Sequence, residues 1–371
     1  MVNYVRLLLL AAILPGILSC SHDTRPYDVR VKEVLGEGLS EYGVKGASAA
    51  VIMPDGSIHR IVAGLSHDTV AIHPDMLFAI GSITKNVVAA LVLLLAEEGV
   101  LTLDDSLSRW LPKYPFVDST ITLRQLLNHT SGLYMFWDNQ KLWDDLKQYR
   151  DSMFAPETVL SYIRDPYFSP GKDFRYSNTN YLLLAMICTR ATNSTLSAEL
   201  RRRFWGPLKI DDVWLSLEEQ IPQNLAHVWG DNFENDGSVR DLTFLPRTSH
   251  ESITYGSSGL FMTATGLARW SHALFRGKVL SEASLGEMLK FGKGGYGLGA
   301  GYFRSALSGG VQAVGHMGGN IGTTASVVYS RRYGVSVVVM INAHHLKCIG
   351  ELTERVGEIT LDYLETLKQK D

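Results

Sequence analysis

Cysteine is scarce in this sequence. There are three cysteines in 371 residues, which is too few for a disulfide framework. No two cysteines are separated by two residues, no His-Glu-x-x-His motif occurs, and His344 and His345 are adjacent rather than one helical turn apart. These absences argue against the common kinds of zinc site, and we expect no bound metal.

The sequence also lacks a concentration of basic charge. Lys and Arg number 35 against 38 Asp and Glu, for a net charge of -3, and they are scattered along the chain. Because nucleic-acid-binding proteins normally carry a basic patch, we expect no nucleic-acid partner. With 46% hydrophobic and 20% charged residues, the composition is that of a globular protein with one large or two ordinary domains.

An apolar run lies at the start of the chain. Arg6 precedes the apolar residues 7–14, and the run ends in Ile17-Leu18-Ser19-Cys20. It is shorter than the roughly 20 residues that span a bilayer, and it has the form of a signal peptide over residues 1–19. The small residue before Cys20 resembles a bacterial lipoprotein cleavage box, so we expect Cys20 to be lipidated and to hold an exported, periplasmic protein on the membrane. Ordinary secretion and an uncleaved anchor stay open.

Residues 20–35 are polar and charged and predict a tether that runs into a helix. Export implies an oxidising compartment, in which Cys188 and Cys348 would remain. Cys188 continues the apolar run 182–187 and is predicted to lie in the core. Whether it pairs with Cys348 stays open.

Strand patterns occur near both ends of the chain, separated by turn residues, at 47–53, 58–64, 324–329 and 335–341. Apolar residues from Ile349 to Leu367 recur at helical spacing and predict a terminal helix. This arrangement predicts an α/β (α+β) fold, in which an antiparallel sheet built from both termini is flanked by helices.

The middle of the chain predicts a mostly helical insertion. The segment 82–98 is apolar on nearly every side, which is typical of a helix inside a domain. Further helix candidates lie at 121–127, 179–191, 196–204 and 265–275, whereas 216–255 has a loop composition. We therefore expect a sheet domain over 36–80 and 290–371 and a helical domain over 81–289, with the active site at their interface.

The sharpest chemical signal is Ser82-Ile83-Thr84-Lys85 at the start of that buried helix. Ser82 and Lys85 are three residues apart and share one helical face. A partly desolvated lysine can lose its proton and accept that of a serine, which makes the serine a nucleophile. By itself, this four-residue pattern is common by chance.

Two weaker signals follow. Tyr176 and Asn178 flank Ser177 and would project to the same side of an extended segment, although a tyrosine before a helix usually just packs. Further on, His316 stands before Gly318 and Gly319, whose small size lets a substrate approach the backbone closely. A histidine in such a turn is as often merely hydrogen-bonded.

Taken together and in this order, the three motifs resemble the serine β-lactamase and penicillin-binding protein family. The similarity is greatest to the branch of class C β-lactamases, D-alanyl-D-alanine carboxypeptidases of the His-x-Gly type and related esterases. Further similar phrases extend the likeness over roughly residues 45–345, at 77–85, 97–105, 126–133, 176–181 and 296–299.

The resemblance implies a β-lactamase-like fold and a role for each motif. Ser82 matches the acylated nucleophile, Lys85 its proton acceptor, and Tyr176 the residue that relays protons to the leaving group and the deacylating water. Asn178 matches the amide that orients the substrate. No metal or organic cofactor is implied.

The last motif matches the substrate-binding strand of the family. His316 takes the place of a lysine, Gly318 belongs to the same binding motif, and the backbone N–H groups of Ser82 and Gly319 match the oxyanion hole. Met317 stands where the family usually has a hydroxyl that binds a substrate carboxylate, and methionine cannot supply one. An unperturbed histidine is mostly neutral at pH 7, so both departures favour ester or amide substrates.

Three other patterns invite different interpretations. His129 and Ser131 lie in 128–132, but no nucleophile-elbow motif frames the serine, so we expect a structural loop. Residues 292–297 match the dinucleotide-binding glycine pattern without the strand and helix that it requires. Aromatic residues in 133–154 suggest either a substrate wall or a flap that packs on itself.

These observations predict an exported serine hydrolase that cleaves amides or esters through an acyl-enzyme. The expected activity is that of a D-alanyl-peptide carboxypeptidase or a β-lactamase, and the alternatives are a carboxylesterase, a penicillin-binding sensor without turnover, or a scaffold that has lost the chemistry. The expected partners are a small-molecule or peptidoglycan-peptide substrate and a membrane surface. The oligomeric state is not predicted.

Overall fold

The computed structural model describes residues 25–231, 238–303, 305, 307 and 313–368. The predicted signal peptide over 1–19 and the lipidation site Cys20 lie outside these residues. Among the helices that are described, none combines the length and the apolar character needed to cross a membrane.

A seven-stranded antiparallel sheet in the order β3-β2-β1-β12-β11-β10-β9 forms the centre of the molecule. N-terminal β1 pairs with C-terminal β12, so that Ala47 lies opposite Ile341, which confirms a sheet built from both ends of the chain. The strands are β1 (Gly46–Ile52), β2 (Ile58–His67), β3 (Val70–Ala71), β9 (Gly301–Phe303), β10 (Ala313–Asn320), β11 (Thr323–Ser330) and β12 (Val335–Ile341).

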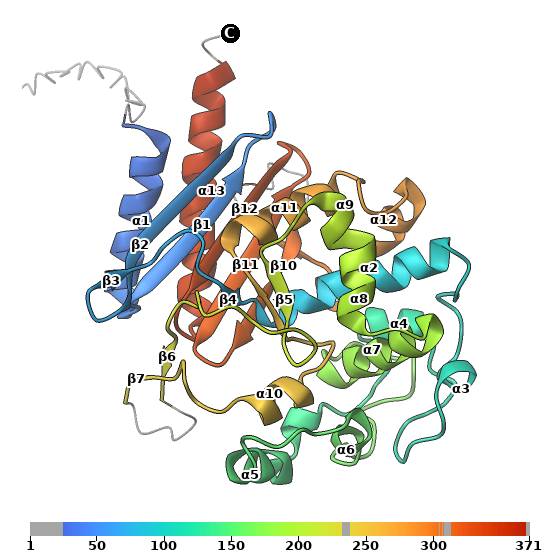
Figure 1. Ribbon diagram of the computed structural model, residues 1–371. Helices are drawn as coiled ribbons and strands as arrows, with labels where there is room; N and C mark the ends of the chain where they lie inside the picture. Colours follow the sequence, from blue (N-terminus) through green and yellow to red (C-terminus); the bar gives the residue numbers. More distant parts are fainter. Residues whose placement is uncertain (1–24, 232–237, 304, 306, 308–312, 369–371) are drawn as a thin grey trace, which may run out of the picture.

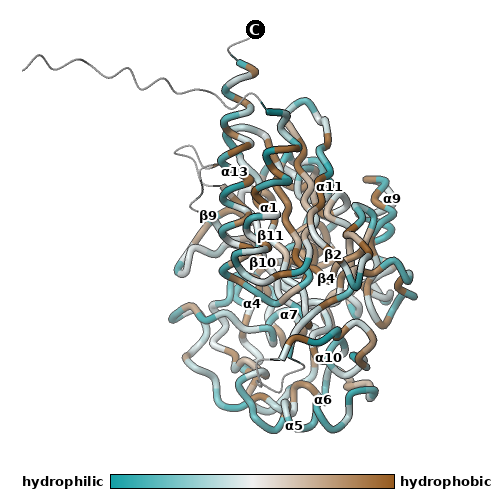
Figure 2. The backbone as a smooth tube through the Cα atoms, turned by 90° about the vertical axis from the view of Figure 1, so that its left-hand side faces the viewer, coloured by the Kyte–Doolittle hydropathy of each residue, from teal (hydrophilic) through white to brown (hydrophobic). Residues whose placement is uncertain are grey.

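Helices cover both faces of this sheet (Figure 1). Helices α1 (Tyr27–Tyr42) and α13 (Leu346–Lys368) lie side by side on one face, and α11 (Ala264–Phe275) packs on the other. Figure 2 views the face with α1 and α13, where hydrophilic and hydrophobic stretches alternate along each helix. Because both faces are covered, β1 and β12 are buried along their whole length, which explains their nearly continuous apolar sequences.

Helix α1 corrects the predicted tether over 20–35. The helix begins at Tyr27, and its side chains at Tyr27, Val31, Leu35 and Leu39 are buried at a spacing of four residues. The charged residues between them face outward, so the segment has a polar composition although one of its faces belongs to the core.

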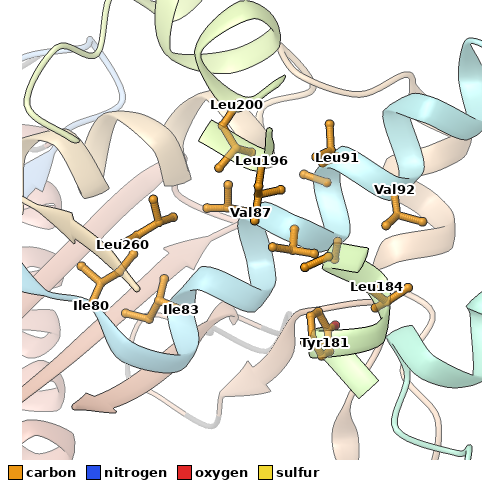
Figure 3. Packing of buried hydrophobic residues seen from close by; sticks show 14 of the residues in the cluster. Ile80, Ile83, Val87, Leu91, Val92, Tyr181, Leu184, Leu196, Leu200 and Leu260 are labelled. Carbon is orange, nitrogen blue, oxygen red and sulfur yellow. The ribbon is translucent and has the colours of Figure 1, made fainter. Parts of the chain in front are cut away.

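The helical region is built around α2 (Thr84–Glu97), most of whose residues are buried. Figure 3 shows α2 residues packed against α7 (Asn178–Thr192) and α8 (Leu196–Leu200), and it labels Val87, Leu91, Val92, Tyr181, Leu184, Leu196 and Leu200. A helix surrounded by other elements needs no polar face, which is why 82–98 is so apolar. Ser82 itself lies in a 3-10 turn, Gly81–Ile83, directly before α2.

The remaining elements are short. The helices are α3 (Leu107–Trp110), α4 (Leu123–Leu127), α5 (Gln140–Gln148), α6 (Pro156–Leu160), a π-helical turn (Arg201–Trp205), α9 (Gly206–Leu208), α10 (Thr248–Ile253) and α12 (Glu282–Met288), with 3-10 turns at Phe136–Asp138 and Lys293–Gly295. The small sheets are β4 (Phe78–Ala79), β8 (Leu260–Met262) and β5 (Val213–Leu215), and β6 (Trp229–Gly230) with β7 (Arg240–Asp241).

Some expectations for this region need correction. The segment 216–255, expected to be irregular, contains β6, β7 and α10. The division into a sheet domain (36–80 and 290–371) and a helical domain (81–289) stays a prediction. Helix α11 belongs by sequence to the predicted helical domain, yet it packs on β1 and β12 of the large sheet. Cys188 is buried as predicted, and both it and Cys348 are free thiols.

Candidate active site

Ser82 lies where the first turn before α2 meets the end of β10. Gly81 has a φ of +54°, and a Cβ added there would come within 2.7 Å of the backbone nitrogen of Gly319. Only glycine therefore allows this close approach of the two backbones. The contact places the Ser82 side chain, which is half-buried, beside the glycines of β10.

Lys85 lies one helical turn further on and is fully buried. Its Nζ donates hydrogen bonds to Oγ of Ser82, at 2.9 Å, and to the carbonyl oxygen of Ser257, at 2.8 Å. Burial holds the pKa of the Lys85 ammonium well below its ordinary value. The amine therefore reaches its neutral, proton-accepting form more readily than an exposed lysine does.

Tyr176 completes the group around the serine. Nζ of Lys85 lies 5.0 Å from the centroid of the Tyr176 ring, and Ser82 is close enough to the phenol to lower its pKa. Burial has the larger and opposite effect, so the pKa of the phenol is raised. Tyr176 is therefore protonated at neutral pH, and the structure brings hydroxyl, amine and phenol together.

Asn178 is the first residue of α7 and lines the same cleft as Ser82. Ser177 before it has an extended backbone, with φ -144° and ψ 126°, so Tyr176 and Asn178 flank an extended residue as expected. The Oδ1 atom of Asn178 is buried and has no hydrogen-bond partner within the described part of the chain. Asn178 therefore carries a hydrogen-bond acceptor that the described residues leave unsatisfied.

His316 lies close to this group but is not a cation. Its Nε2 accepts a hydrogen bond from the Tyr296 hydroxyl at 2.8 Å, and its Nδ1 donates to the carbonyl oxygen of Met317 at 2.6 Å. Burial and the neighbouring Lys85 lower the pKa of His316 to about 3. The histidine is neutral at physiological pH and does not line the cleft.

Along β10, alternate side chains point to opposite faces of the sheet. A Cβ on Gly318 would come within 2.7 Å of the backbone nitrogen of Ser82, whereas one on Gly319 would meet the ring of His344. Met317 packs against the core cluster on the side of α1 and α13. Its side chain therefore points away from Ser82, which corrects the expectation that this position decides carboxylate binding.

The cleft itself is a cavity of about 710 Å³ that joins the sheet and the helical region. Trp137 and Trp143 line it, with ring centroids 4.7 Å apart, whereas Phe154 lines a different cavity. At the far end, Nζ of Lys45 lies 3.7 Å from the centroid of a ring of Trp229. Part of the aromatic segment 133–154 is thus a wall of the cleft, as one of the two expectations proposed.

The competing motifs do not form sites of their own. The Ser131 hydroxyl donates to Oδ1 of Asn180 at 2.7 Å and is buried, so it is not paired with His129 as a nucleophile would be. Residues 292–297 form a 3-10 turn followed by a bridge to β9, without the helix that a dinucleotide site requires. Within the described ranges, no group of three His, Cys, Asp or Glu could hold a metal ion.

Two contributors to the site carry no chemical motif of their own. Tyr296 lies in the family-like segment 296–299, and its hydroxyl is the partner of His316. The carbonyl of Ser257 holds Lys85, and no sequence signal marks it because any residue type supplies a carbonyl.

The fold and this grouping of serine, lysine and tyrosine side chains are those of one protein family. The chain belongs to the Beta-lactamase family, whose model matches residues 31–358. It is 28% identical to penicillin-binding protein 4* of Bacillus subtilis (strain 168), over 56% of this chain and 47% of that protein. It is also 28% identical to esterase EstB of Burkholderia gladioli, over 90% of this chain and 95% of the esterase.

Among solved structures, a D-stereospecific amidohydrolase from Streptomyces sp. is similar, with a TM-score of 0.77 and 26% identity. The match covers 88% of this chain and 98% of the amidohydrolase. By contrast, the chain spans only about half the length of two curated relatives, 47% of penicillin-binding protein 4* and 49% of penicillin-binding protein 4 of Amycolatopsis lactamdurans.

Proposed function

We propose that this protein hydrolyses esters or amides through an acyl-enzyme on Ser82. The observation that carries the proposal is the contact of a fully buried Lys85 amine with Oγ of Ser82 at 2.9 Å. Burial favours the neutral form of the amine. Because a neutral Lys85 contacts the Ser82 hydroxyl, it can accept the proton of that hydroxyl.

In the proposed reaction, Oγ of Ser82 attacks the substrate carbonyl carbon while its proton passes to Nζ of Lys85. The oxyanion that forms is bound by the N–H groups of Ser82 and Gly319, as the family resemblance implies. Tyr176 gives its proton to the leaving oxygen or nitrogen and is reprotonated from Lys85. The leaving group departs, and an ester on Ser82 remains.

Deacylation reverses these transfers with water as the nucleophile. Water loses a proton to the pair of Tyr176 and Lys85 and attacks the ester carbonyl. The acid leaves and Oγ of Ser82 regains its proton. Asn178 orients the substrate, for which its buried and unpartnered Oδ1 is available.

We further propose that the preferred substrates carry no carboxylate beside the scissile bond. His316 is neutral, with a pKa of about 3, and Met317 points away from the cleft, so neither binds an anion there. This favours esters and amides, including D-amino acyl amides, over D-alanyl-D-alanine peptides and penicillins. Two similar proteins support this choice. They are esterase EstB and the D-stereospecific amidohydrolase from Streptomyces sp., and each is matched over most of its length.

A matched pair of substrates tests this proposal. An N-acyl-D-alanyl-D-alanine and its C-terminal amide share the scissile bond and differ in the terminal carboxylate. We expect faster hydrolysis of the amide, and of p-nitrophenyl butyrate than of nitrocefin. Faster hydrolysis of the free acid would contradict this preference and would favour a D-alanyl-D-alanine carboxypeptidase.

Intact-mass spectrometry with a fluorophosphonate tests the acyl-enzyme itself. The wild type should gain one adduct, and Ser82→Ala should gain none. Ser131→Ala is the matched control, because Ser131 is a buried serine that donates to Asn180, and it should be labelled like the wild type. An adduct that persists in Ser82→Ala would contradict the proposal.

For localisation we propose export with removal of 1–19 and lipidation of Cys20. The apolar run that ends in Ser19-Cys20 supports this. In a bacterial host fed an alkyne-bearing fatty acid, the wild type should be labelled and partition with membranes. Cys20→Ser should lose both properties, and equal labelling of the two would exclude the lipid anchor.

A further inference from the structure

His129 is a buried titratable residue beside Tyr176, and the proposed reaction assigns it no role. It is fully buried, and its backbone has a φ of +59°, a left-handed conformation that few residues other than glycine adopt. Such a conformation persists only where the surroundings hold it in place.

The hydrogen bonds of His129 lie on both sides of Tyr176. Its carbonyl oxygen accepts the backbone N–H of Arg175 at 3.0 Å, and its Nδ1 accepts the backbone N–H of Ser177 at 3.2 Å. Nδ1 also accepts the side-chain amide of Asn180 at 3.0 Å. One residue thus fixes the chain directly before and directly after the catalytic phenol.

The ring of His129 also contacts the tyrosine ring itself. The two centroids are 4.2 Å apart with an interplanar angle of 35°, and the Tyr296 ring lies 4.9 Å away on the same histidine. The chain on both sides of Tyr176 and the ring of Tyr176 are therefore held by one residue, whose side chain supplies the bond to Ser177 and the ring contact.

The protonation state of His129 follows from its donors. A backbone N–H can only donate, so Nδ1 must be an acceptor and the ring proton sits on Nε2. Burial and the nearby Lys85 and His316 hold the pKa of His129 well below its ordinary value, so the ring stays neutral. A neutral ring does not oppose a protonated Lys85 during turnover.

We infer that His129 is a positioning residue that fixes Tyr176 for proton transfer by holding the chain on both sides of the phenol. This inference rests on the proposed acyl-enzyme function. His129 does not line the cleft and is bonded to backbone rather than to Ser82, so it acts only through Tyr176.

The test compares His129→Leu with His129→Asn. Leucine has a similar size but no acceptor, whereas asparagine places an oxygen near the position of Nδ1 and tolerates the left-handed backbone. Because a misplaced catalytic group costs up to about 100-fold, we expect His129→Leu to lower kcat by about 10- to 100-fold with little change in KM. His129→Asn should recover most of this loss.

A double-mutant cycle with Tyr176→Phe separates positioning from general destabilisation. If His129 acts through the phenol, His129→Leu should change kcat by less than about threefold once the hydroxyl is absent, within the usual error of additivity. Equal losses in both backgrounds, or no rescue by asparagine, would overturn the inference.

Two controls complete the experiment. His272→Leu removes another histidine with a buried, unpartnered ring nitrogen, on α11 away from the cleft, and should leave kcat unchanged. If His129→Leu does not fold, His129→Phe replaces it, since it keeps a flat ring without an acceptor. Failure of the proposed function would show as a wild type that forms no Ser82 adduct, whereas failure of this inference would show in an active enzyme.

Discussion

The Tyr296 hydroxyl donates a hydrogen bond to Nε2 of His316 at 2.8 Å, while Nδ1–H of the same ring is satisfied by the Met317 carbonyl. Nδ1 must donate to that carbonyl, and because burial keeps the ring neutral, Nε2 is left as the acceptor. The family resemblance associates this position with a positively charged lysine. Here it holds a neutral histidine, His316, whose two ring nitrogens are hydrogen-bonded within the protein.

The neutral histidines should make the fold sensitive to acid. His316 has a native pKa of about 3, and the pKa of buried His129 is also well below its ordinary value. An unfolded histidine takes up a proton near pH 6.5, so between about pH 6.5 and 3 the unfolded state binds more protons than the native state. The free energy of unfolding should therefore decrease as the pH is lowered through this window. The decrease is up to about 1.4 kcal/mol per pH unit for each histidine that stays neutral in the native state.

Urea unfolding between pH 7 and pH 4 measures this slope. Carboxylates also contribute to acid unfolding, so the informative comparison is with His316→Gln, which cannot gain a charge. The variant should lose stability less steeply than the wild type on acidification. Parallel slopes would show that His316 does not titrate as the buried geometry indicates.

Lys85 should set the acid side of the activity profile. Burial lowers its pKa well below the ordinary value of 10.5, so kcat/KM for acylation should rise with pH and reach its half-maximum below pH 10.5. Lys85→Arg keeps a positive charge but cannot supply a base, and it should be inactive at every pH. Burst kinetics with a p-nitrophenyl ester measure acylation, and a half-maximum at the pKa of an exposed lysine would contradict the role.

The adjacent glycines Gly318 and Gly319 of β10 should differ in their tolerance of alanine. The added Cβ of Gly318→Ala would meet the backbone of the Ser82 turn, which cannot move without displacing the nucleophile, so we expect acylation to fall by about 100-fold. In Gly319→Ala, the added Cβ would lie 2.5 Å from Cε1 of the His344 ring. Because this contact is with a side chain and not with backbone, His344 can move to make room. The loss should be smaller, and His344→Ala in the same chain should relieve it.

Met317→Thr should not change substrate selectivity. Because the side chain packs against the cluster on the α1 and α13 face, a hydroxyl there lies on the wrong side of the sheet to meet a carboxylate. The ratio of rates on the N-acyl-D-alanyl-D-alanine and its amide should stay constant. The expected effect is a loss of stability of about 1–3 kcal/mol from replacing buried apolar surface with a hydroxyl. A selective gain on the free acid would contradict this geometry.

Local patterns in the sequence predicted the elements well where burial on all sides leaves a simple signature. The expected strand 335–341 is β12, and the terminal helix built on Ile349 to Leu367 is α13. A helix was expected after the tether, but the start of α1 at Tyr27 was missed because its charged outer face hides a stripe of single apolar residues. The short elements of 216–255 were missed because strands of two residues carry no periodicity.

The chemical groups that are present, and the shared helical face of Ser82 and Lys85, can be read from the order of residues, because a three-residue spacing is a local property of the backbone. The approach of Tyr176 to Ser82, the orientation of Met317 and the neutral state of His316 depend on how distant segments pack. The physical reason is that the direction of a side chain in a sheet and the charge of a buried group depend on neighbours brought from distant parts of the chain, which no local pattern records.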